Sequence, residues 1–286
     1  MNLTFIKIHD RWMAEFKVES DFNLHIEGVK QGNISLFQRT TENGEYAYIH
    51  TAVTPTSGTI YDSDFSAILY PKYIRVSCAT EPTLAVVTSG GEITPIKIKS
   101  DVIPLGVSIQ HVNGYAYTTE EWTEEGFSND LANGVIVATE EHRFVIAKDI
   151  VGTGMNWSSD TSNAVDGLAV VSSKNEAQID YKGKGNTALM LATDTSGAGY
   201  SCDNFAFTNG QKGYLPALGE WYIAYQNKSA IDAALALIGG TALGSKYYWS
   251  STQYGGASAW YLRWDNGNTN YYDKGGNYYA RPFTTL

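Results

Sequence analysis

The side chains best suited to molecular recognition are concentrated in residues 247–283, where Tyr, Asn, Ser and Gly recur between tryptophans. Tyrosine gives a large amphipathic contact area at low entropic cost, and Ser, Gly and Asn give adaptable hydrogen bonds. We therefore predict a ligand-binding surface here. Its candidate residues are Tyr254, Gly255, Gly256, Ala257, Ser258, Tyr261, Arg263, Asp265, Asn268, Asn270, Tyr271, Tyr272, Asp273, Gly275, Gly276, Asn277 and Tyr278.

A strand must position part of this surface. Trp260 and Trp264 share one parity of the sequence, while Tyr261, Arg263 and Asp265 share the other. Because alternate side chains of a strand point to opposite faces, the indoles are expected to be buried and the other three to face solvent.

A hairpin turn is predicted next, because Asn266-Gly267 accepts the positive φ that tight hairpins require. Beneath the displayed residues we expect a buried scaffold. Its members are Trp249, Trp260, Trp264 and Arg281.

The composition limits the function classes. The 286 residues are 17% charged and 13% aromatic, with a formal net charge of −10. This indicates a β-rich globular chain and argues against binding to nucleic acid, which needs a basic face. No apolar run is long enough for a transmembrane helix, and the first residues do not resemble a secretory signal, so we expect no membrane insertion.

Few residues suggest catalysis or metal binding. Cys78 and Cys202 fall in different predicted domains, which favours two buried free thiols. The histidines, His9, His25, His50, His111 and His142, are scattered. Residues 182–187 do not fit a phosphate-binding loop, and no zinc-protease or nucleophile-elbow motif occurs. We expect no enzyme activity, no cofactor and no metal, although the loop 160–166 could supply some oxygen ligands to calcium.

Two domains are expected, an all-β sandwich over residues 1–97 and an α+β domain over 98–286. Alternating short strands separated by polar turns predict the first, and Gly90-Gly91 and Pro95 mark the boundary. The predicted strands of the first domain are 12–18, 22–26, 33–37, 45–49 and 72–78. In the second domain we expect strands at 106–112, 134–138 and 143–147, and helices at 186–193 with Asn186 as N-cap, at 216–225, and from Ser229 to the glycines 239 and 240.

Four phrases in the second domain carry a resemblance: residues 132–137 with 144–147, then 214–221, 248–252 and 280–282. In this order they resemble the C-type lectin fold, in the branch shared with formylglycine-generating enzymes and bacterial surface lectin-like domains. The resemblance covers roughly residues 100–286. It implies a ligand-binding surface built from the hairpin and loops near the C-terminus.

The terminal block, about 247–283, is similar to the variable region of proteins encoded by diversity-generating retroelements. In these systems a reverse transcriptase miscopies adenines, which turns Asn codons of the AAY type into almost any codon ending in a pyrimidine. Every candidate residue above is reachable from such a codon or is an unaltered Asn, whereas Trp260, Trp264 and Lys274 are not reachable. This resemblance implies a hypervariable protein of a gut-bacterial phage or its host; residues 19–25 and 37–39 also resemble small β-domains of phage structural proteins.

We therefore predict a non-enzymatic receptor-binding protein for adhesion. Its partner would be a protein or glycan receptor on a cell surface. The N-terminal domain would attach it to a virion, such as a phage tail, or to an appendage, and homo-oligomers are possible. An extracellular or cell-surface location is equally compatible.

Three alternatives stay open. A formylglycine-generating enzyme needs reactive cysteines, which the terminal block lacks. A calcium-dependent lectin uses a Trp-Asn-Asp strand, whereas Trp264-Asp265-Asn266 has the inverted order, and Glu81-Pro82 is in the other domain. The third alternative is a structural appendage domain that binds nothing specific.

Overall fold

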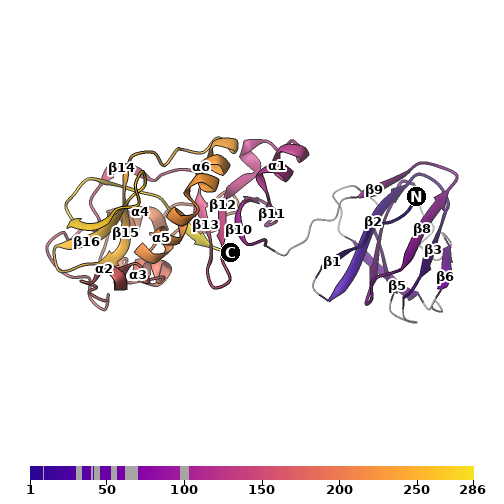
Figure 1. Ribbon diagram of the computed structural model, residues 1–286, viewed down its shortest axis with the longest axis horizontal. Helices are drawn as coiled ribbons and strands as arrows, with labels where there is room; N and C mark the ends of the chain where they lie inside the picture. Colours follow the sequence, from indigo (N-terminus) through magenta and orange to yellow (C-terminus); the bar gives the residue numbers. More distant parts are fainter. Residues whose placement is uncertain are drawn as a thin grey trace. The chain divides into compact units, whose positions relative to one another are not determined.

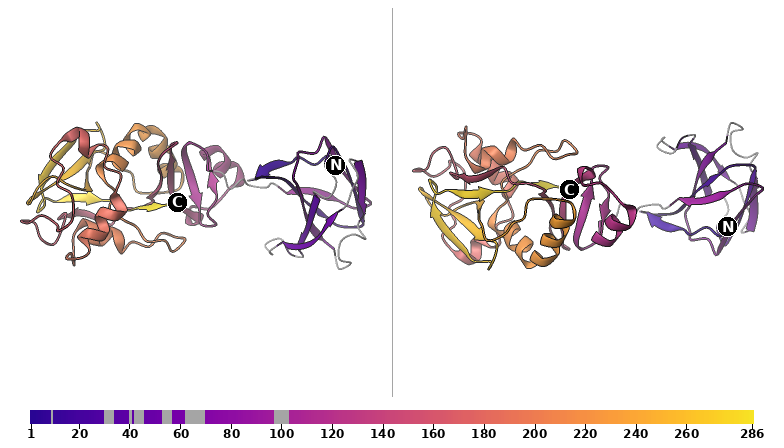
Figure 2. Two further views of the ribbon diagram at one scale, coloured as in Figure 1. Left: turned by 90° about the horizontal axis from the view of Figure 1, so that it is seen from below. Right: turned by 90° about the horizontal axis from the view of Figure 1, so that it is seen from above.

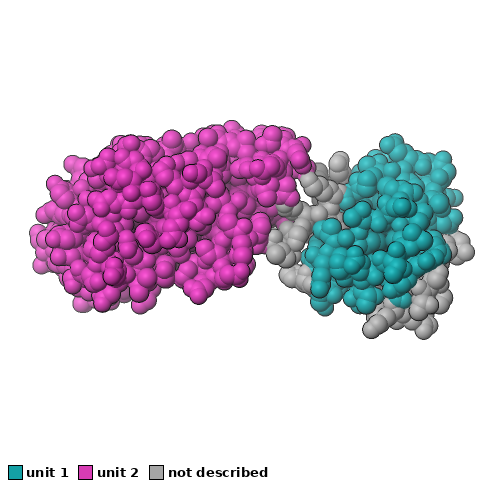
Figure 3. All heavy atoms as spheres, viewed as in Figure 1, with its two compact units in different colours: residues 1–102 teal, residues 103–286 magenta. Residues whose placement is uncertain are grey.

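The computed structural model describes residues 1–8, 10–29, 34–39, 41, 46–52, 57–61, 70–96 and 103–286, with only the backbone of 50–52 and 57–61. The chain divides into two compact units, Met1–Val102 and Ile103–Leu286, which Figure 3 colours separately. The predicted boundary at 97/98 and the histidine His9 lie outside the described residues. Each unit is described by itself.

The N-terminal unit is built from two antiparallel sheets. The larger has the order β1-β2-β7-β4-β5, with β9 also paired to β2, and the smaller has the order β6-β3-β8. The strands are β1 (Ile6–Ile8), β2 (Arg11–Val18), β3 (Phe22–Glu27), β4 (Ile34–Arg39), β5 (Ala47–Ala52), β6 (Ser57–Tyr61), β7 (Lys72–Cys78), β8 (Leu84–Ser89) and β9 (Ile93–Ile96).

The core of this unit lies between its two sheets. Phe16 of β2 and Val76 of β7 pack in one buried cluster with Leu24 of β3 and Val87 of β8. Burial alternates along β3, as a strand with one face toward a core requires. The described part of this unit is therefore an all-β sandwich, as predicted.

All five predicted strands of this unit occur, although residues 33 and 45 lie outside the described part of the chain. Four more strands were not predicted: β1, β6, β8 and β9. Ser57-Gly58 reads as a turn but begins β6, and Pro95 reads as a connector but lies in β9. Among the strands that the structure describes, β9 pairs only with β2, so Pro95 is on a sheet edge, where its missing N–H is tolerated.

The C-terminal unit contains two sheets and a set of short helices (Figure 1). The first sheet has the order β11-β10-β12-β13-β19 and the second β14-β18-β15-β16-β17. Their strands are β10 (Gly106–His111), β11 (Ala116–Tyr117), β12 (Ala132–Ala138), β13 (Arg143–Ala147), β14 (Gly152–Met155), β15 (Tyr247–Gln253), β16 (Ser258–Arg263), β17 (Thr269–Asp273), β18 (Tyr278–Ala280) and β19 (Phe283–Thr285). The helices are α1 (Thr119–Glu125), the 3-10 turn η2 (Asn129–Leu131), α2 (Lys174–Ala177), α3 (Gly183–Met190), α4 (Ala198–Asp203), α5 (Leu218–Gln226) and α6 (Lys228–Leu237).

Helices α5 and α6 join the two sheets. Trp221 of α5 and Leu235 of α6 belong to the same buried cluster as Val135 of the first sheet and Trp260 of the second, and Figure 1 shows both helices between the sheets. Most residues of β12 and β13 are buried, which explains their continuous apolar sequence. This cluster is the main core of the unit.

A second core covers the other face of the second sheet. Trp157 of the loop after β14, Met190 of α3 and Cys202 of α4 cluster with Trp249 of β15 and Tyr261 of β16. Figure 2 shows α3 and α4 on one side of the terminal strands, drawn in yellow, and α5 and α6 on the other. The second sheet is therefore covered on both faces over its central strands.

All three predicted helices occur, but α3 begins and ends three residues earlier than predicted, and two of the predicted caps are wrong. Helix α5 begins at Leu218, and the carboxylate of Glu220 in its first turn accepts from the N–H of Ala217. Helix α6 ends shortly before Gly239, which has φ +66°. Asn186 is not a cap: it lies inside α3, buried, and donates to Asp180 Oδ2 at 3.0 Å. Ser229 is not a cap either, since α6 already begins at Lys228.

Candidate ligand-binding surface

The structure separates the displayed residues from their scaffold almost as predicted. Of the 17 candidate residues, nine are exposed and seven are half-buried. The scaffold side chains Trp249, Trp264 and Arg281 are fully buried, and Trp260 is 3% exposed. The candidate residues come from β16, β17 and the loops that flank these strands, except Tyr278, which begins β18.

Tyr261 is the exception, and its predicted exposure is wrong. Its side chain is only 8% exposed, because the second core packs on the face of β16 that the alternation assigned to solvent. The covering residues come from the irregular loop after β14 and from short helices. A tyrosine tolerates this position because its ring is apolar and its hydroxyl is polar only at the tip. Arg263 and Asp265 on the same face are half-buried.

The hairpin is present, with a longer turn than predicted. Strand β16 ends at Arg263 and β17 begins at Thr269, and the N–H of Gly267 donates to the carbonyl of Arg263 at 2.9 Å. Gly267 has φ +69°, the conformation for which a glycine was expected. Strand β17 lies at the edge of the sheet, and its alternate side chains point to the two opposite faces.

What we call the first patch lies on one face of β17. It consists of Tyr271 of β17 and Tyr254 of the loop between β15 and β16. Tyr271 lies directly across from Trp260 in the ladder. The two tyrosine rings stack with centroids 3.5 Å apart at 7°, and both meet the Trp260 indole edge-on at 5.6 and 5.8 Å. Because Tyr271 is 43% exposed and Trp260 is buried, the patch is an aromatic platform resting on an indole.

The opposite face carries the second patch, Tyr247, Tyr261, Tyr272 and Tyr278. Tyr247 and Tyr278 stack at 5.1 Å and 17°, Tyr261 meets Tyr278 edge-on at 4.9 Å, and Tyr272 lies 5.3 Å from Tyr278. Tyr278 also packs on Trp249, at 4.7 Å. Burial raises the pKa of Tyr278 to about 12, so its hydroxyl stays protonated and can donate hydrogen bonds. Tyr247 was not among the candidates. The next residue, Tyr248, is also a tyrosine but is buried, so residue type alone does not show which of the two faces the surface.

Arg263 and Asp265 form a pair of their own beside the second patch. The guanidinium contacts both carboxylate oxygens at 2.7 Å and lies 5.3 Å from the centroid of the Tyr247 ring. The two candidate residues therefore neutralise each other, and the surface they flank offers mainly aromatic and amide groups.

The indole N–H groups below the two patches bond chiefly to backbone carbonyls. Trp249 donates to Met155 at 2.8 Å, Trp260 to Val171 at 2.7 Å and Trp157 to Ser250 at 2.6 Å. Trp264 instead donates to the carboxylate of Asp232 in α6 at 2.9 Å. These bonds tie β15, β16 and their turn to the loops and helices that cover them.

Lys274 is fully buried and belongs to the scaffold. From the sequence it stood out only as a residue that adenine miscopying of an AAY codon cannot produce. Its ammonium group donates to the carbonyl of Asn163 at 2.7 Å and to Gln253 Oε1 at 2.8 Å, and lies 4.6 Å from the Trp157 ring centroid. Its backbone N–H donates to the carbonyl of Ala257 at 2.8 Å. Lys274 therefore ties its own turn to the loop that contains Asn163, to the end of β15 and to the displayed loop that contains Ala257.

Groups that could perform chemistry are few near this surface. Among the residues that the structure describes, no cluster of three or more His, Cys, Asp or Glu side chains could hold a metal ion. Asp160, proposed above as one oxygen ligand, accepts bonds from the N–H groups of Ser162 and Asn163 at 2.9 and 3.1 Å and so is engaged in its own turn. Cys202 and Cys78 are both buried free thiols, as expected. None of the described helices is long and apolar enough to cross a membrane.

Tyr261 and Tyr272 should respond differently to truncation. Tyr261→Ala opens a cavity in the second core and should lower the free energy of unfolding by about 2–4 kcal/mol. Tyr272→Ala removes a side chain that is 51% exposed and should change it by less than about 1 kcal/mol. Urea denaturation of both variants measures this difference; equal losses would show that position 261 is not a core position.

The stability of the unit should depend on pH through Lys274. Burial lowers the pKa of Lys274 to about 8, against the opposing pull of the Asp160 and Asp194 charges. The unfolded chain holds this proton up to about pH 10.5, so between the two values it binds more protons than the native state. The free energy of unfolding should therefore rise with pH across this window.

Lys274→Met removes that contribution while keeping an unbranched side chain of similar length. Between pH 7 and 10, wild type should gain about 1–3 kcal/mol relative to the variant in urea denaturation. Tyrosines titrating at high pH are common to both proteins and cancel in the comparison. If the free energies of unfolding of wild type and variant changed equally with pH, the lowering of the Lys274 pKa by burial would be contradicted.

No family model matches the chain, and no curated protein matches it in sequence. Among solved structures, it is similar to a fimbrial protein from Bacteroides ovatus ATCC 8483, with a TM-score of 0.46 and 12% sequence identity over 99% of this chain and 75% of that one. A likeness at this level assigns neither a fold family nor a function to the chain.

Proposed function

We propose that this chain is a non-enzymatic binding protein that displays a diversified surface on a C-type lectin fold, of the kind encoded by diversity-generating retroelements. The observation that carries the proposal is the division of residues 247–283 into two sets. The 17 candidate residues are all reachable by adenine miscopying and are exposed or half-buried except Tyr261, and the unreachable Trp260, Trp264 and Lys274 are buried. Such a division lets a surface vary while its support stays constant.

The bonding pattern supports the same proposal. Trp249 and Trp260, and Lys274 in part, donate to backbone carbonyls, which are present whatever side chain a position carries. Exposed substitutions usually change stability by about 0.5 kcal/mol or less. The hairpin β16–β17 and its neighbouring loops form the surface, as the resemblance to the C-type lectin fold implies.

The ligand would be a protein or glycan receptor on a cell surface. Exposed tyrosine platforms bordered by Asn, Ser and Gly suit either, since they combine ring stacking with adaptable hydrogen bonds. The N-terminal sandwich would attach the protein to a virion or an appendage, and several copies on one particle or in a homo-oligomer would strengthen weak individual contacts. A phage tail or a bacterial cell surface would suit this role.

An enzyme of the formylglycine-generating type is the weaker reading. That chemistry requires a reactive thiolate, and burial raises the pKa of Cys202 well above its ordinary value. A buried, protonated thiol is unsuited to nucleophilic chemistry, which supports a binding role for this unit.

Binding should depend on the exposed tyrosines of β17 and not on an exposed tyrosine elsewhere in the unit. We expect Tyr271→Ala and Tyr272→Ala together to weaken binding of the labelled protein to receptor-bearing bacterial cells by at least about tenfold, with the melting temperature nearly unchanged. The matched control is Tyr200→Ala, which removes a tyrosine that is 40% exposed in α4. Equal effects of the control and the double variant on cell binding would contradict the proposal.

Diversification itself is tested in the DNA around the gene. We expect a near-copy of the segment that encodes residues 247–283, differing from it at adenines, next to a gene for a reverse transcriptase. Resequencing of the locus in a growing population should show changes at Asn-derived codons and none at the codons of Trp260 and Trp264, which contain no adenine. Changes spread evenly over both sets would contradict the diversification.

A further inference from the structure

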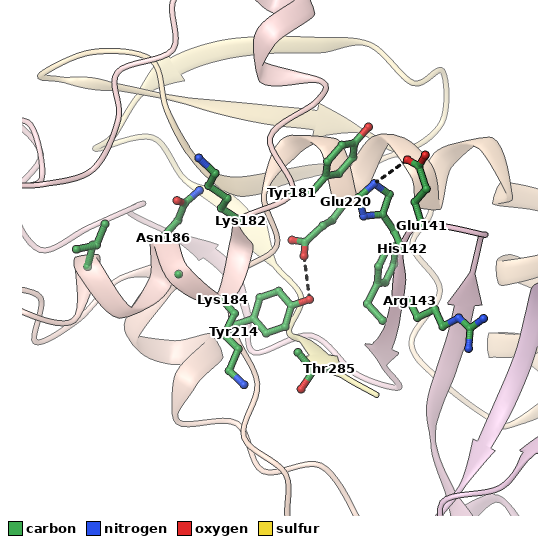
Figure 4. Close-up of a pocket in the computed structure, with 13 residues that line it drawn as sticks. Glu141, His142, Arg143, Tyr181, Lys182, Lys184, Asn186, Tyr214, Glu220 and Thr285 are labelled. Carbon is green, nitrogen blue, oxygen red and sulfur yellow. Dashed lines mark hydrogen bonds and ion pairs between the residues drawn. The ribbon is translucent and has the colours of Figure 1, made fainter. Parts of the chain in front are cut away.

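The C-terminal unit contains a cavity of about 540 Å³ that shares no residue with the tyrosine-rich surface. It is lined by the start of β13, the loop before α3, α3 itself, Tyr214 and the end of β19. Its volume is in the range of sites for small organic ligands. Figure 4 shows His142 and Arg143 on one side of the Glu220–Tyr214 pair, and Lys182 and Lys184 on the other.

The floor of the cavity is polar. Tyr214 donates to Glu220 Oε1 at 3.0 Å, and the N–H of Ala217 donates to Glu220 Oε2 at 2.7 Å. Both floor side chains are under 10% exposed. Burial raises the pKa of Glu220 to about 8, against the bonds from Ala217 and Tyr214, so near pH 7 its carboxyl is mostly protonated. The floor therefore offers hydrogen-bonding groups without repelling an anion.

One wall of the cavity is aromatic. The His142 and Tyr181 rings lie 3.9 Å apart between centroids at 34°, and both side chains are half-buried. Leu189 of α3 is 39% exposed and also lines the cavity. Flat aromatic and aliphatic walls favour a ligand with a flat, weakly polar face, such as the C–H face of a sugar ring.

The rim carries three cations and one exposed carboxylate, that of Glu141, within an acidic unit. Residues 103–286 contain 11 Lys and Arg but 18 Asp and Glu. Even so, Arg143, Lys182 and Lys184 all line this cavity and are exposed. None of the three forms an ion pair with another described residue, in a unit where acidic partners are in excess. Unpaired cations around a cavity are suited to a ligand that brings its own negative charge.

From these four observations we propose that the cavity binds an acidic sugar residue, a uronic or sialic acid unit, free or at the end of a glycan. The ring would lie against the wall of His142, Tyr181 and Leu189. Its hydroxyls would bond to Glu220 and Tyr214, and its carboxylate would meet Lys182 and Lys184. A neutral sugar would leave the cations without a partner, and a simple anion would leave the aromatic wall unused. This site is independent of the function proposed for the tyrosine-rich surface.

The test is titration of the full chain by isothermal calorimetry with glucuronic, galacturonic and N-acetylneuraminic acids. Glucose, galactose, acetate and inorganic phosphate serve as comparison ligands. We expect at least one acidic sugar to bind with a Kd below about 10 mM, and to bind about tenfold or more tightly than its neutral counterpart, acetate and phosphate. Failure of all three acids to bind at that concentration would overturn the proposal, as would equal binding of phosphate, which would leave an anion site only.

Variants locate the site. Lys182→Ala with Lys184→Ala should weaken binding of the acidic sugar about tenfold or more, because two charged contacts are lost. Lys174→Ala, an exposed lysine of α2 outside the cavity, should leave it unchanged. Both lysines of the first variant are exposed, so a melting curve should match that of wild type. Binding that survives the double substitution, or falls equally with Lys174→Ala, would show that the cavity is not the site.

Discussion

The tyrosine-rich surface depends on hydrogen bonds from buried side chains to backbone carbonyls. Trp249, Trp260 and Lys274 each donate to a carbonyl of the loops that the surface is made from or rests upon. A buried donor without a partner costs about 1–3 kcal/mol, so each of these bonds strongly favours one loop conformation. Because a carbonyl belongs to every residue type, the bonds persist when the displayed side chains change.

Coverage of both faces of the second sheet limits which positions can vary freely. Tyr271 and Tyr272 are at the sheet edge, where each face opens to solvent, whereas Tyr261 lies one strand inward and under the second core. A substitution at an edge position alters a contact surface, but a substitution at position 261 must also refill a packed volume. If the surface is diversified as proposed, the reachable codons tolerated best at position 261 would be those for large apolar or aromatic residues.

The parts of this fold that local pattern determines could be predicted, and the parts that depend on distant packing could not. The alternation of Trp260 and Trp264 located β16 and its buried face, and the Asn-Gly pair located the turn. The turn spans five residues instead of two, but the resulting register differs by two residues, which keeps every side chain on its face. Burial of Tyr261 could not be predicted, because its cover includes an irregular loop without periodicity. Asn186 failed as a cap for a related reason: α3 begins at Gly183, and the Asn186 side chain donates to Asp180, which also accepts from the distant Thr252.

On the two proposals together, the unit presents two kinds of recognition with different electrostatics. The tyrosine-rich surface is nearly neutral where Arg263 and Asp265 pair, so its contacts depend on shape and stacking. The cation-lined cavity lies in an acidic unit, and at physiological salt its charges act only over about 8 Å. Its lysines cannot steer an anionic glycan from a distance against the net charge of the unit. They can only discriminate once a sugar ring has entered, so the cavity would contribute specificity for a terminal acidic residue more than speed of association.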